Sequence, residues 1–316
     1  MLNHNGKIYE DKNTLLFSAQ NRAFSYADAL FETIRIVTSV KKNTINYTIP
    51  LWKYHFKRLS KGMEAFGYDK LESSFLESEI LKTTYLTIPT NKFLKNDLLT
   101  DFKARLTIFR TEGGLYTPTN SKSEFVIVLQ EINKLNYFDS NELEKLQKNY
   151  VFFEELPLFP SSFSSFKKVD ALPYILAGKY RKEQQADEVF LLNNQSRIAE
   201  AGAANVFILD TKISSQEENK LHFITPPPSE GGVMGTMRNY LLDKQIDKNT
   251  YKSLNNQGNF EISIEEKPIT KTELNQAEII FTTNAVQSIQ IIKIKTKKQL
   301  EIMKKWINEM NRTFLF

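Results

Sequence analysis

The stretch FKKVDALPYILAGKYRKEQQADEVFLLNNQSRIAEAGAANVFIL, residues 166–209, decides the fold. It begins with two adjacent lysines, Lys167 and Lys168, and continues with the pattern of an amphipathic helix. The apolar run 188–192 predicts a strand, which turns through Asn-Asn-Gln-Ser and returns toward Glu200. The pattern therefore brings one lysine and one glutamate to the ends of packed elements. A lysine amine can form a Schiff base with an aldehyde cofactor, and a carboxylate can hold a ring nitrogen in its protonated form.

Composition excludes several classes of protein. The chain has 316 residues, enough for two domains, since single cores tend to divide near about 250 to 300 residues. Hydrophobic residues make up 41% of it, which is too many for general disorder. The absence of cysteine excludes disulfides, thiolate metal sites and cysteine nucleophiles, and we expect no metal site. The first residues do not resemble a signal peptide, and no run of about 18 apolar residues occurs, so we expect a cytoplasmic protein without a membrane partner.

The charge pattern argues against a nucleic-acid partner. The formal net charge is +5, but the 42 basic residues are scattered among 37 acidic ones. Lysine-rich spots such as 297–298 and 304–305 have the character of solvated helix faces rather than of a continuous stripe that reads phosphates.

The polarity pattern divides the chain into two predicted domains. Residues 1–131 are expected to form a mixed α/β domain. The polar residues 132–148 begin where strand periodicity stops, and we expect them to link the domains. Residues 149–316 then form the second domain.

Within the first domain, apolar residues at helical spacing predict a helix over 51–66, and Gly67 follows as its C-cap. Alternating residues predict strands over 104–110 and 125–129. In the second domain, Gly235 precedes a helical pattern. A glycine followed by a helix N-terminus suits an anion, because free backbone N–H groups and the helix dipole both favour negative charge.

The stretch that opens this section resembles the class IV aminotransferases, which are pyridoxal-phosphate (PLP) enzymes of fold type IV. That group includes branched-chain and D-amino-acid aminotransferases and 4-amino-4-deoxychorismate lyases. Its pattern is a lysine, an apolar helix, Asp-Glu before an apolar strand, and a glutamate followed by Asn-Val-Phe. The corresponding residues here are Lys167, 171–177, Asp187-Glu188, Glu200 and 205–207. This register selects Lys167 over Lys168, because it places the apolar helix where the family has it.

Further blocks of the family occur in order along the chain. They are FSYADALFETIR (24–35), YHFKRL (54–59), TPPP (225–228) with GTMR (235–238), and IIFTTNA (279–285). Ala27 and Ala29 stand where glycines are usual. Six blocks in the right order are very improbable by chance.

The resemblance implies a fold and a cofactor site. The fold is α/β (α+β) and similar to D-amino-acid aminotransferase, with a small N-terminal domain, a larger C-terminal domain and PLP between them. By resemblance, Lys167 is the catalytic residue that holds PLP as a Schiff base and moves the Cα proton, while Glu200 pairs with the pyridine nitrogen. The implied cofactor-binding residues are Arg58, Lys167, Glu200, Asn205, Thr236, Met237, Asn284 and Ala285. A homodimer is also implied.

Several residues are candidates for binding the substrate carboxylate. In this family the loop after the strand at 104–110 takes part, and in several members it holds an arginine. Leu115 stands about where that arginine would fall. The candidates by position are Arg35, Arg105, Arg110 and Tyr116.

Three functions stay open at this point. The first is transfer of an amino group between an amino acid and a 2-oxo acid through a Lys167 Schiff base. The second is the 4-amino-4-deoxychorismate lyase reaction of folate synthesis, which releases pyruvate to give 4-aminobenzoate. Met237 and the Thr-Asn-Ala ending at Ala285 resemble the lyases, and Leu172 stands where branched-chain enzymes usually have a tyrosine. The third is a binding protein that keeps the fold and PLP without catalysis. Substrate identity and stereochemistry are left open.

Overall fold

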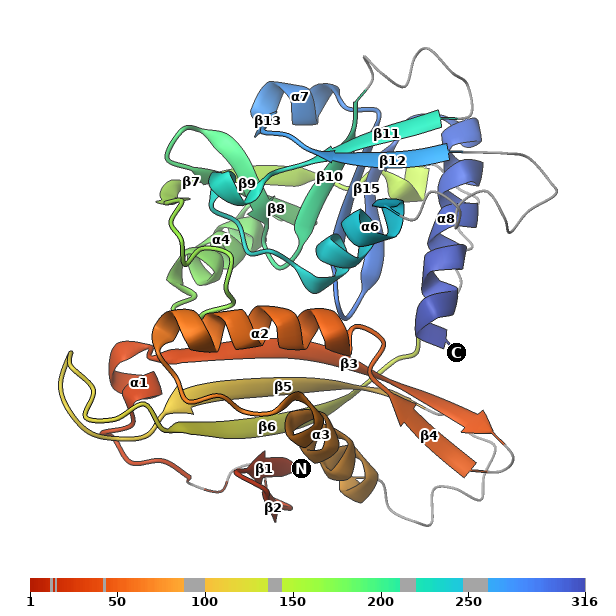
Figure 1. Ribbon diagram of the computed structural model, residues 1–316. Coiled ribbons are helices and arrows are strands. Elements are labelled where there is room, and N and C mark those ends of the chain that lie inside the picture. The colour runs from red at the N-terminus through yellow and green to blue at the C-terminus, as the bar shows by residue number, and fades with distance from the viewer. Residues whose placement is uncertain are drawn as a thin grey trace. The chain divides into compact units, whose positions relative to one another are not determined.

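The computed structural model describes residues 1–316 except 12, 13, 15, 42–43, 88–99, 136–143, 211–219, 247–260 and 316. It divides into two compact units (Figure 1). Unit 1 comprises Met1–Asn136, Phe166–Asp170 and Arg312–Phe316, and unit 2 comprises Tyr137–Ser165 and Ala171–Asn311. The predicted domain limits at 131 and 149 stay a prediction. Of the predicted link, 132–148, residues 136–143 lie outside the described part of the chain.

Unit 1 is built on a six-stranded sheet in the order β2-β1-β6-β5-β3-β4, and every neighbouring pair is antiparallel. Its strands are β1 (Leu2–His4), β2 (Lys7–Tyr9), β3 (Ala29–Lys41), β4 (Thr44–Thr48), β5 (Asp101–Arg110) and β6 (Ser123–Ile132). Its helices are α1 (Arg22–Tyr26), α2 (Trp52–Phe66) and α3 (Ser73–Thr87).

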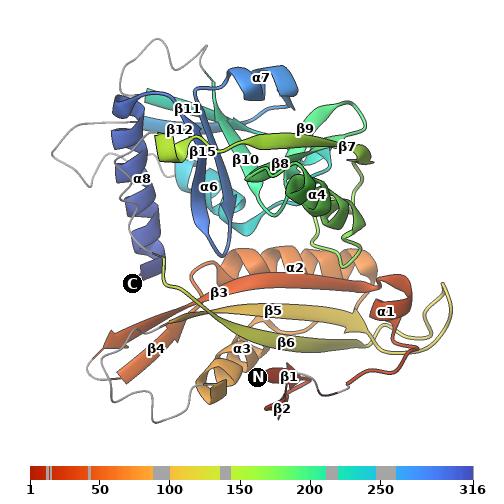
Figure 2. The same ribbon diagram turned by 180° about the vertical axis from the view of Figure 1, so that it is seen from behind.

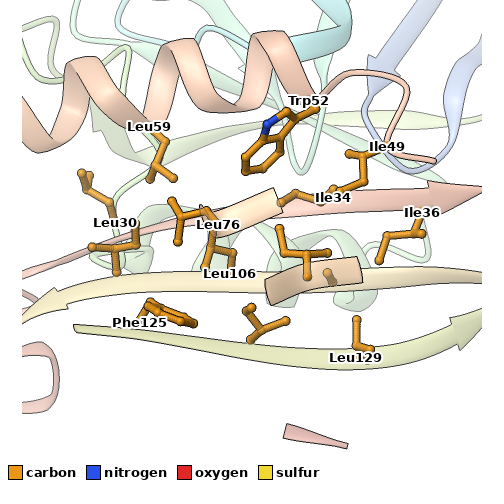
Figure 3. Packing of buried hydrophobic residues seen from close by; sticks show 14 of the residues in the cluster. Leu30, Ile34, Ile36, Ile49, Trp52, Leu59, Leu76, Leu106, Phe125 and Leu129 are labelled. Carbon is orange, nitrogen blue, oxygen red and sulfur yellow. The ribbon is translucent and has the colours of Figure 1, made fainter. Parts of the chain in front are cut away.

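Helices α2 and α3 cover one face of this sheet, as the two opposite views show (Figures 1 and 2). Alternate residues of β3, such as Leu30 and Ile34, point toward them, because successive side chains of a strand face opposite sides. Leu59 of α2 and Leu76 of α3 complete this core (Figure 3). The predicted helix at 51–66 is confirmed as α2, and it ends at Gly67, whose φ of 66° is a left-handed conformation that glycine adopts without strain.

Unit 2 contains two sheets. A five-stranded sheet has the order β12-β11-β10-β14-β15, and a four-stranded sheet has the order β13-β9-β8-β7. The strands are β7 (Tyr150–Leu158), β8 (Glu188–Asn193), β9 (Arg197–Ala201), β10 (Asn205–Leu209), β11 (Lys220–Thr225), β12 (Glu261–Glu266), β13 (Ile269–Thr270), β14 (Ile279–Asn284) and β15 (Ser288–Ile294). Apolar residues of both sheets form one core cluster.

The helices of unit 2 are α4 (Leu172–Glu183), α6 (Thr236–Ile246), α7 (Lys271–Gln276) and α8 (Lys297–Leu315), and α8 groups with unit 1 from Arg312 onward. Unit 2 also has short 3₁₀ turns, η2 (Glu144–Leu146) and η3 (Pro228–Glu230). Helix α4 packs on β7 and β8 through Ala177, Phe153 and Val189. Helix α7 begins with a capping box, in which Thr270 and Glu273 each accept a backbone N–H of the other. Among the described residues, no helix is both long and apolar enough to cross a bilayer.

Candidate functional site

The lysine pair belongs to unit 1, where it lies beside β3. Phe31 N donates to Lys167 O at 2.9 Å, and Val169 N donates to Ala29 O at 3.1 Å. Lys168 is the direct antiparallel partner of Leu30. The segment thus forms an isolated antiparallel bridge with β3, and in such an extended segment consecutive lysines point to opposite sides.

The two lysines have different surroundings. Lys167 Nζ lies 4.7 Å from the centroid of the Phe31 ring, where the face of the ring attracts a cation. Lys168 Nζ instead pairs with Asp170 Oδ2 at 3.0 Å. Lys167, which the sequence register selects, is therefore the lysine whose amine contacts an aromatic ring of β3.

Arg58 is held by a buried carboxylate. Its Nε donates to Glu32 Oε1 at 2.7 Å and its Nη2 to Glu32 Oε2 at 2.5 Å. His55, one helical turn earlier on α2, places Nδ1 at 2.7 Å from Oε2 of the same carboxylate. Burial disfavours the charge of Glu32, but Arg58 and then His55 outweigh it and lower the pKa of Glu32 to about 2. The bidentate pair fixes the plane of the guanidinium.

The Glu32 carboxylate should make the stability of the protein depend on pH in acid. Its pKa falls from the ordinary 4.5 to about 2 on folding, so its stabilisation is complete above pH 4.5 and is lost as the pH falls through 2. This amounts to about 3 kcal/mol of unfolding free energy. Urea titrations between pH 5 and the lowest pH at which the chain still folds should show a steeper loss for the wild type than for Glu32→Gln. An equal pH dependence of the unfolding free energy in the two proteins would contradict the lowered pKa of Glu32.

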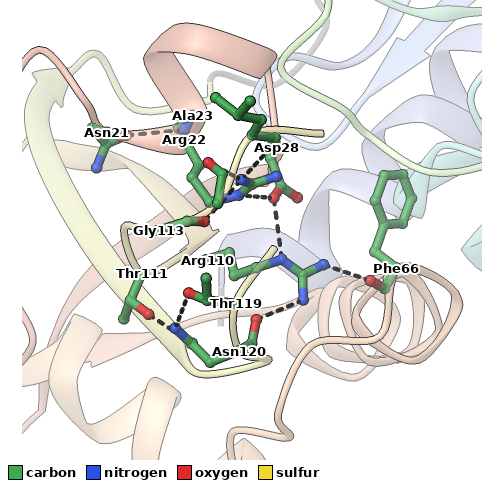
Figure 4. Close-up of polar contacts among 12 residues, drawn as sticks. Asn21, Arg22, Ala23, Asp28, Phe66, Arg110, Thr111, Gly113, Thr119 and Asn120 are labelled. Carbon is green, nitrogen blue, oxygen red and sulfur yellow. Dashed lines mark hydrogen bonds and ion pairs between the residues drawn. The ribbon is translucent and has the colours of Figure 1, made fainter. Parts of the chain in front are cut away.

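Two of the four residues predicted to bind the substrate carboxylate form hydrogen bonds inside unit 1. Arg35 is buried and donates twice to Asp101, through Nε at 3.0 Å and Nη2 at 2.6 Å, and once to Asn133 O. Arg110 donates to Asp28 and to the carbonyls of Phe66, Gly67 and Asn120 (Figure 4). These contacts tie strands and loops together.

The loop after β5 is fixed by another arginine. Arg22 Nη1 donates to the carbonyls of Gly113, Gly114 and Leu115 at 3.1, 3.2 and 2.7 Å, and its Nε donates to Asp28 at 2.8 Å (Figure 4). Tyr116, the next residue of this loop, is 91% exposed to solvent.

Arg105 has a different environment from the other candidates. It lies on β5, and its guanidinium carbon is 3.8 Å from the centroid of the Phe31 ring. The residue is exposed, and partial burial of its guanidinium lowers its pKa. Among the described residues, no carboxylate pairs with it. The Lys167 amine and the Arg105 guanidinium thus share one ring.

In unit 2, the Glu200 carboxylate is buried on β9, with 4% of the residue exposed. Two donors reach the same oxygen: Tyr174 Oη donates to Oε1 at 2.5 Å and Val233 N donates to it at 3.0 Å. The position and plane of the carboxylate are therefore fixed.

Asn205 fastens the loop that leads into α6. Its Oδ1 accepts from Gly235 N at 3.0 Å, and its Nδ2 donates to Val233 O at 2.7 Å. A Cβ on Gly235 would lie 1.9 Å from Asn205 Oδ1, so only glycine fits. Thr236 and Met237 then form the first turn of α6 and are buried, and the backbone N–H groups of such a turn are suited to an anion.

Asn284 and Ala285 lie where β14 turns into β15. The Asn284 side chain serves the turn itself, since its Oδ1 accepts from Val286 N at 2.9 Å and from Gln287 N at 2.7 Å. Helix α6 packs against β14. The side chain of Asn284 is thus engaged within the turn, and a contact of Asn284 and Ala285 with a ligand through their backbone amides stays a prediction.

Sequence reasoning did not predict that Glu32, His55, Phe31 and Tyr174 contact one another or the candidate residues. The spacing of His55 and Arg58 by one helical turn was a usable signal, because such residues share a face and can share a partner. No comparable signal joins Tyr174 to Glu200, which lie on separate elements.

Comparison with solved structures supports the two-domain α/β fold. The branched-chain amino acid aminotransferase of Escherichia coli aligns with a TM-score of 0.69 at 15% identity, covering 99% of this chain and 92% of that chain. The 4-amino-4-deoxychorismate lyase of Pseudomonas aeruginosa aligns with a TM-score of 0.67 at 18% identity, covering 100% of both. At these identities the likeness shows the fold.

Sequence comparison identifies the family. A probable branched-chain-amino-acid aminotransferase of Aquifex aeolicus is 24% identical over 300 residues, which cover 89% of this chain and 80% of the relative. Residues 29–294 match the family model of amino-transferase class IV. The chain therefore belongs to the class IV aminotransferases, and it is a PLP-dependent enzyme of fold type IV.

Proposed function

We propose that this aminotransferase acts on an amino acid whose carboxylate is bound by Arg105, and that Lys167 is its catalytic residue. The observation that carries the proposal is the sharing of the Phe31 ring by the Lys167 amine and the Arg105 guanidinium. An amine that reacts and a cation that recognises a carboxylate are the two groups that an amino-acid substrate requires near its α-carbon.

The side chains of each unit fit parts of PLP. Unit 1 offers a primary amine, Lys167, and a guanidinium, Arg58, whose orientation Glu32 fixes. Unit 2 offers a buried carboxylate, Glu200, and a helix N-terminus at Thr236. An amine suits the aldehyde, a carboxylate suits the pyridine nitrogen, and a guanidinium or backbone N–H groups suit the phosphate.

When bound, PLP withdraws electrons from the substrate carbon that loses a proton. In our proposal Lys167 Nζ would hold the cofactor until the substrate amine displaces it, and the amine thereby set free would accept the proton from the substrate α-carbon. Arg105 holds the carboxylate on that carbon, so that the carbon stays within reach of Nζ. The ring of Phe31, on β3, lies beside both side chains.

The remaining predicted residues would hold the cofactor. Glu200 would accept a hydrogen bond from the protonated pyridine nitrogen. Arg58 would bind the phosphate together with the backbone N–H groups that the sequence assigns to it, those of Thr236, Met237, Asn284 and Ala285. Asn205 would contribute indirectly, because its hydrogen bonds to Val233 and Gly235 hold the loop that leads into α6.

The proposal is tested by mixing the PLP-loaded enzyme, in the absence of any 2-oxo acid, with L-glutamate, L-leucine, D-alanine or aminodeoxychorismate. We expect one of the amino acids to convert the bound cofactor to pyridoxamine phosphate and to release one equivalent of its 2-oxo acid. Pyruvate from aminodeoxychorismate with PLP regenerated would establish the lyase instead. Bound PLP with no turnover of any amine would establish a binding protein and would contradict both enzymes.

We also propose that the enzyme is a homodimer. The feature that supports this is a group of large exposed side chains on α1 and the loop after β5, where Phe24, Leu115 and Tyr116 are 82%, 75% and 91% exposed. Such side chains gathered in one region are typical of interaction sites. Light scattering should give twice the mass of one chain, and the mass of one chain would contradict the proposal.

A further inference from the structure

A short hydrogen bond joins Tyr174 of α4 to Glu200 of β9. The phenol donates to Oε1 at 2.5 Å, a length typical of strong hydrogen bonds between O–H and an ionised carboxylate. Val233 N donates to the same oxygen. Two donors on one oxygen hold the carboxylate plane and thereby determine where its other oxygen points.

We propose that Tyr174 is a positioning residue of the cofactor site, whose phenol fixes Glu200 so that Oε2 meets the pyridine nitrogen. This rests on the proposed role of Glu200. The phenol also shares the negative charge of the carboxylate, which moderates how strongly Glu200 attracts the proton of the ring nitrogen.

The sequence of α4 explains why the phenol comes from residue 174. Leu172, which stands where branched-chain enzymes usually have a tyrosine, is exposed. Tyr174 lies two residues later, about 200° around the helix, and it packs with the cluster that joins α4 to β7 and β8. This chain therefore turns a phenol of α4 toward the carboxylate of β9.

A purely structural role for Tyr174 predicts different behaviour. Helix α4 is anchored independently of the hydroxyl, through buried Ala177 and the contact of Tyr180 with Phe153, whose ring centroids are 5.8 Å apart. Removing only the hydroxyl should therefore leave the helix in place. Arg238 also interacts electrostatically with Glu200, and it is paired with Glu266 at 2.5 Å, so it stays in place in the same variant.

The experiment compares Tyr174→Phe with Tyr180→Phe, each as the PLP-loaded enzyme. Both changes remove one hydroxyl from the same helix. We expect Tyr174→Phe to lower kcat about tenfold, as for a lost hydrogen bond to a charged group, with KM unchanged and the melting temperature lowered by only a few degrees. We also expect the pH at which the visible band of the bound cofactor changes to shift by about one unit. Tyr180→Phe should match the wild type.

Two outcomes would overturn the inference. One is equal kcat and equal spectral titrations for the two variants. The other is a loss of activity in Tyr174→Phe that follows its melting temperature, with an unshifted titration. Glu200→Gln separates this failure from that of the proposed function. If Glu200→Gln is impaired while Tyr174→Phe is normal, only the role of Tyr174 fails. If Glu200→Gln is itself normal, the role of Glu200 fails as well.

Discussion

Replacing Lys167 with alanine is expected to lower turnover by at least about a thousandfold, because proton transfer by a positioned side chain and covalent attachment are lost together. The visible absorbance band of the bound cofactor should disappear in the same variant. The segment that carries Lys167 is held to β3 by backbone hydrogen bonds, through Phe31 N and Ala29 O, and the substitution leaves these bonds in place. The apoprotein should therefore keep its fold, as circular dichroism would check, so that lost turnover reports lost chemistry.

Lys168 provides the matched control. It is the adjacent residue with the same side chain, but its amine pairs with Asp170. Lys168→Ala should keep the visible band and most of the turnover. The assignment would be contradicted if Lys168→Ala lost the band and Lys167→Ala kept it.

Replacing Arg105 with methionine should lower kcat/KM for the amino-acid substrate about a hundredfold, which corresponds to the loss of a charge-assisted hydrogen bond to the carboxylate. Methionine keeps the length and apolar character of the side chain, so the contact with Phe31 is retained in part. Arg105→Lys should recover some activity, because it restores the charge without the planar pair of donors. Steady-state kinetics with the amino acid found in the substrate panel measures both.

Carboxylate recognition by Arg105 is tested specifically by comparing the amino acid with a primary amine that has no carboxylate. The wild type should prefer the amino acid strongly, and Arg105→Met should lose most of that preference. Lys57→Met, which removes an exposed cation of α2, controls for the change in net charge. An equal loss toward both substrates would contradict carboxylate recognition by Arg105.

Local pattern was sufficient to predict the elements that carry the site. Helix α2 follows from apolar spacing and from Gly67, both of which act within the helix itself. Strands β8, β9 and β10 follow from their apolar runs and intervening turns. The order of the family blocks then predicts the fold, which the comparisons confirm.

Long-range pairing was not predictable in the same way. Four residues were candidates for carboxylate recognition, and sequence position could not rank them. What distinguishes Arg35 from Arg105 is Asp101, 66 residues away from Arg35, and a single sequence does not state which cation a distant carboxylate engages. The same holds for Glu32, whose partner Arg58 is 26 residues away.

The placement of the lysine segment depends on a similar long-range contact. Residues 166–170 lie within the part of the sequence that was expected to form the second domain, yet they group with unit 1. The reason is backbone pairing with β3, through Phe31 N and Ala29 O. Hydrogen bonds of this kind depend on main-chain geometry rather than on residue type, so the side-chain pattern carries no signal of them.

The most direct test of the central claim is to reduce the PLP-loaded enzyme with borohydride, digest it, and find by mass spectrometry which peptide carries the phosphopyridoxyl group. The account predicts one modified residue, Lys167, at close to one equivalent per chain. A label on Lys168, on any other lysine, or on none would contradict it.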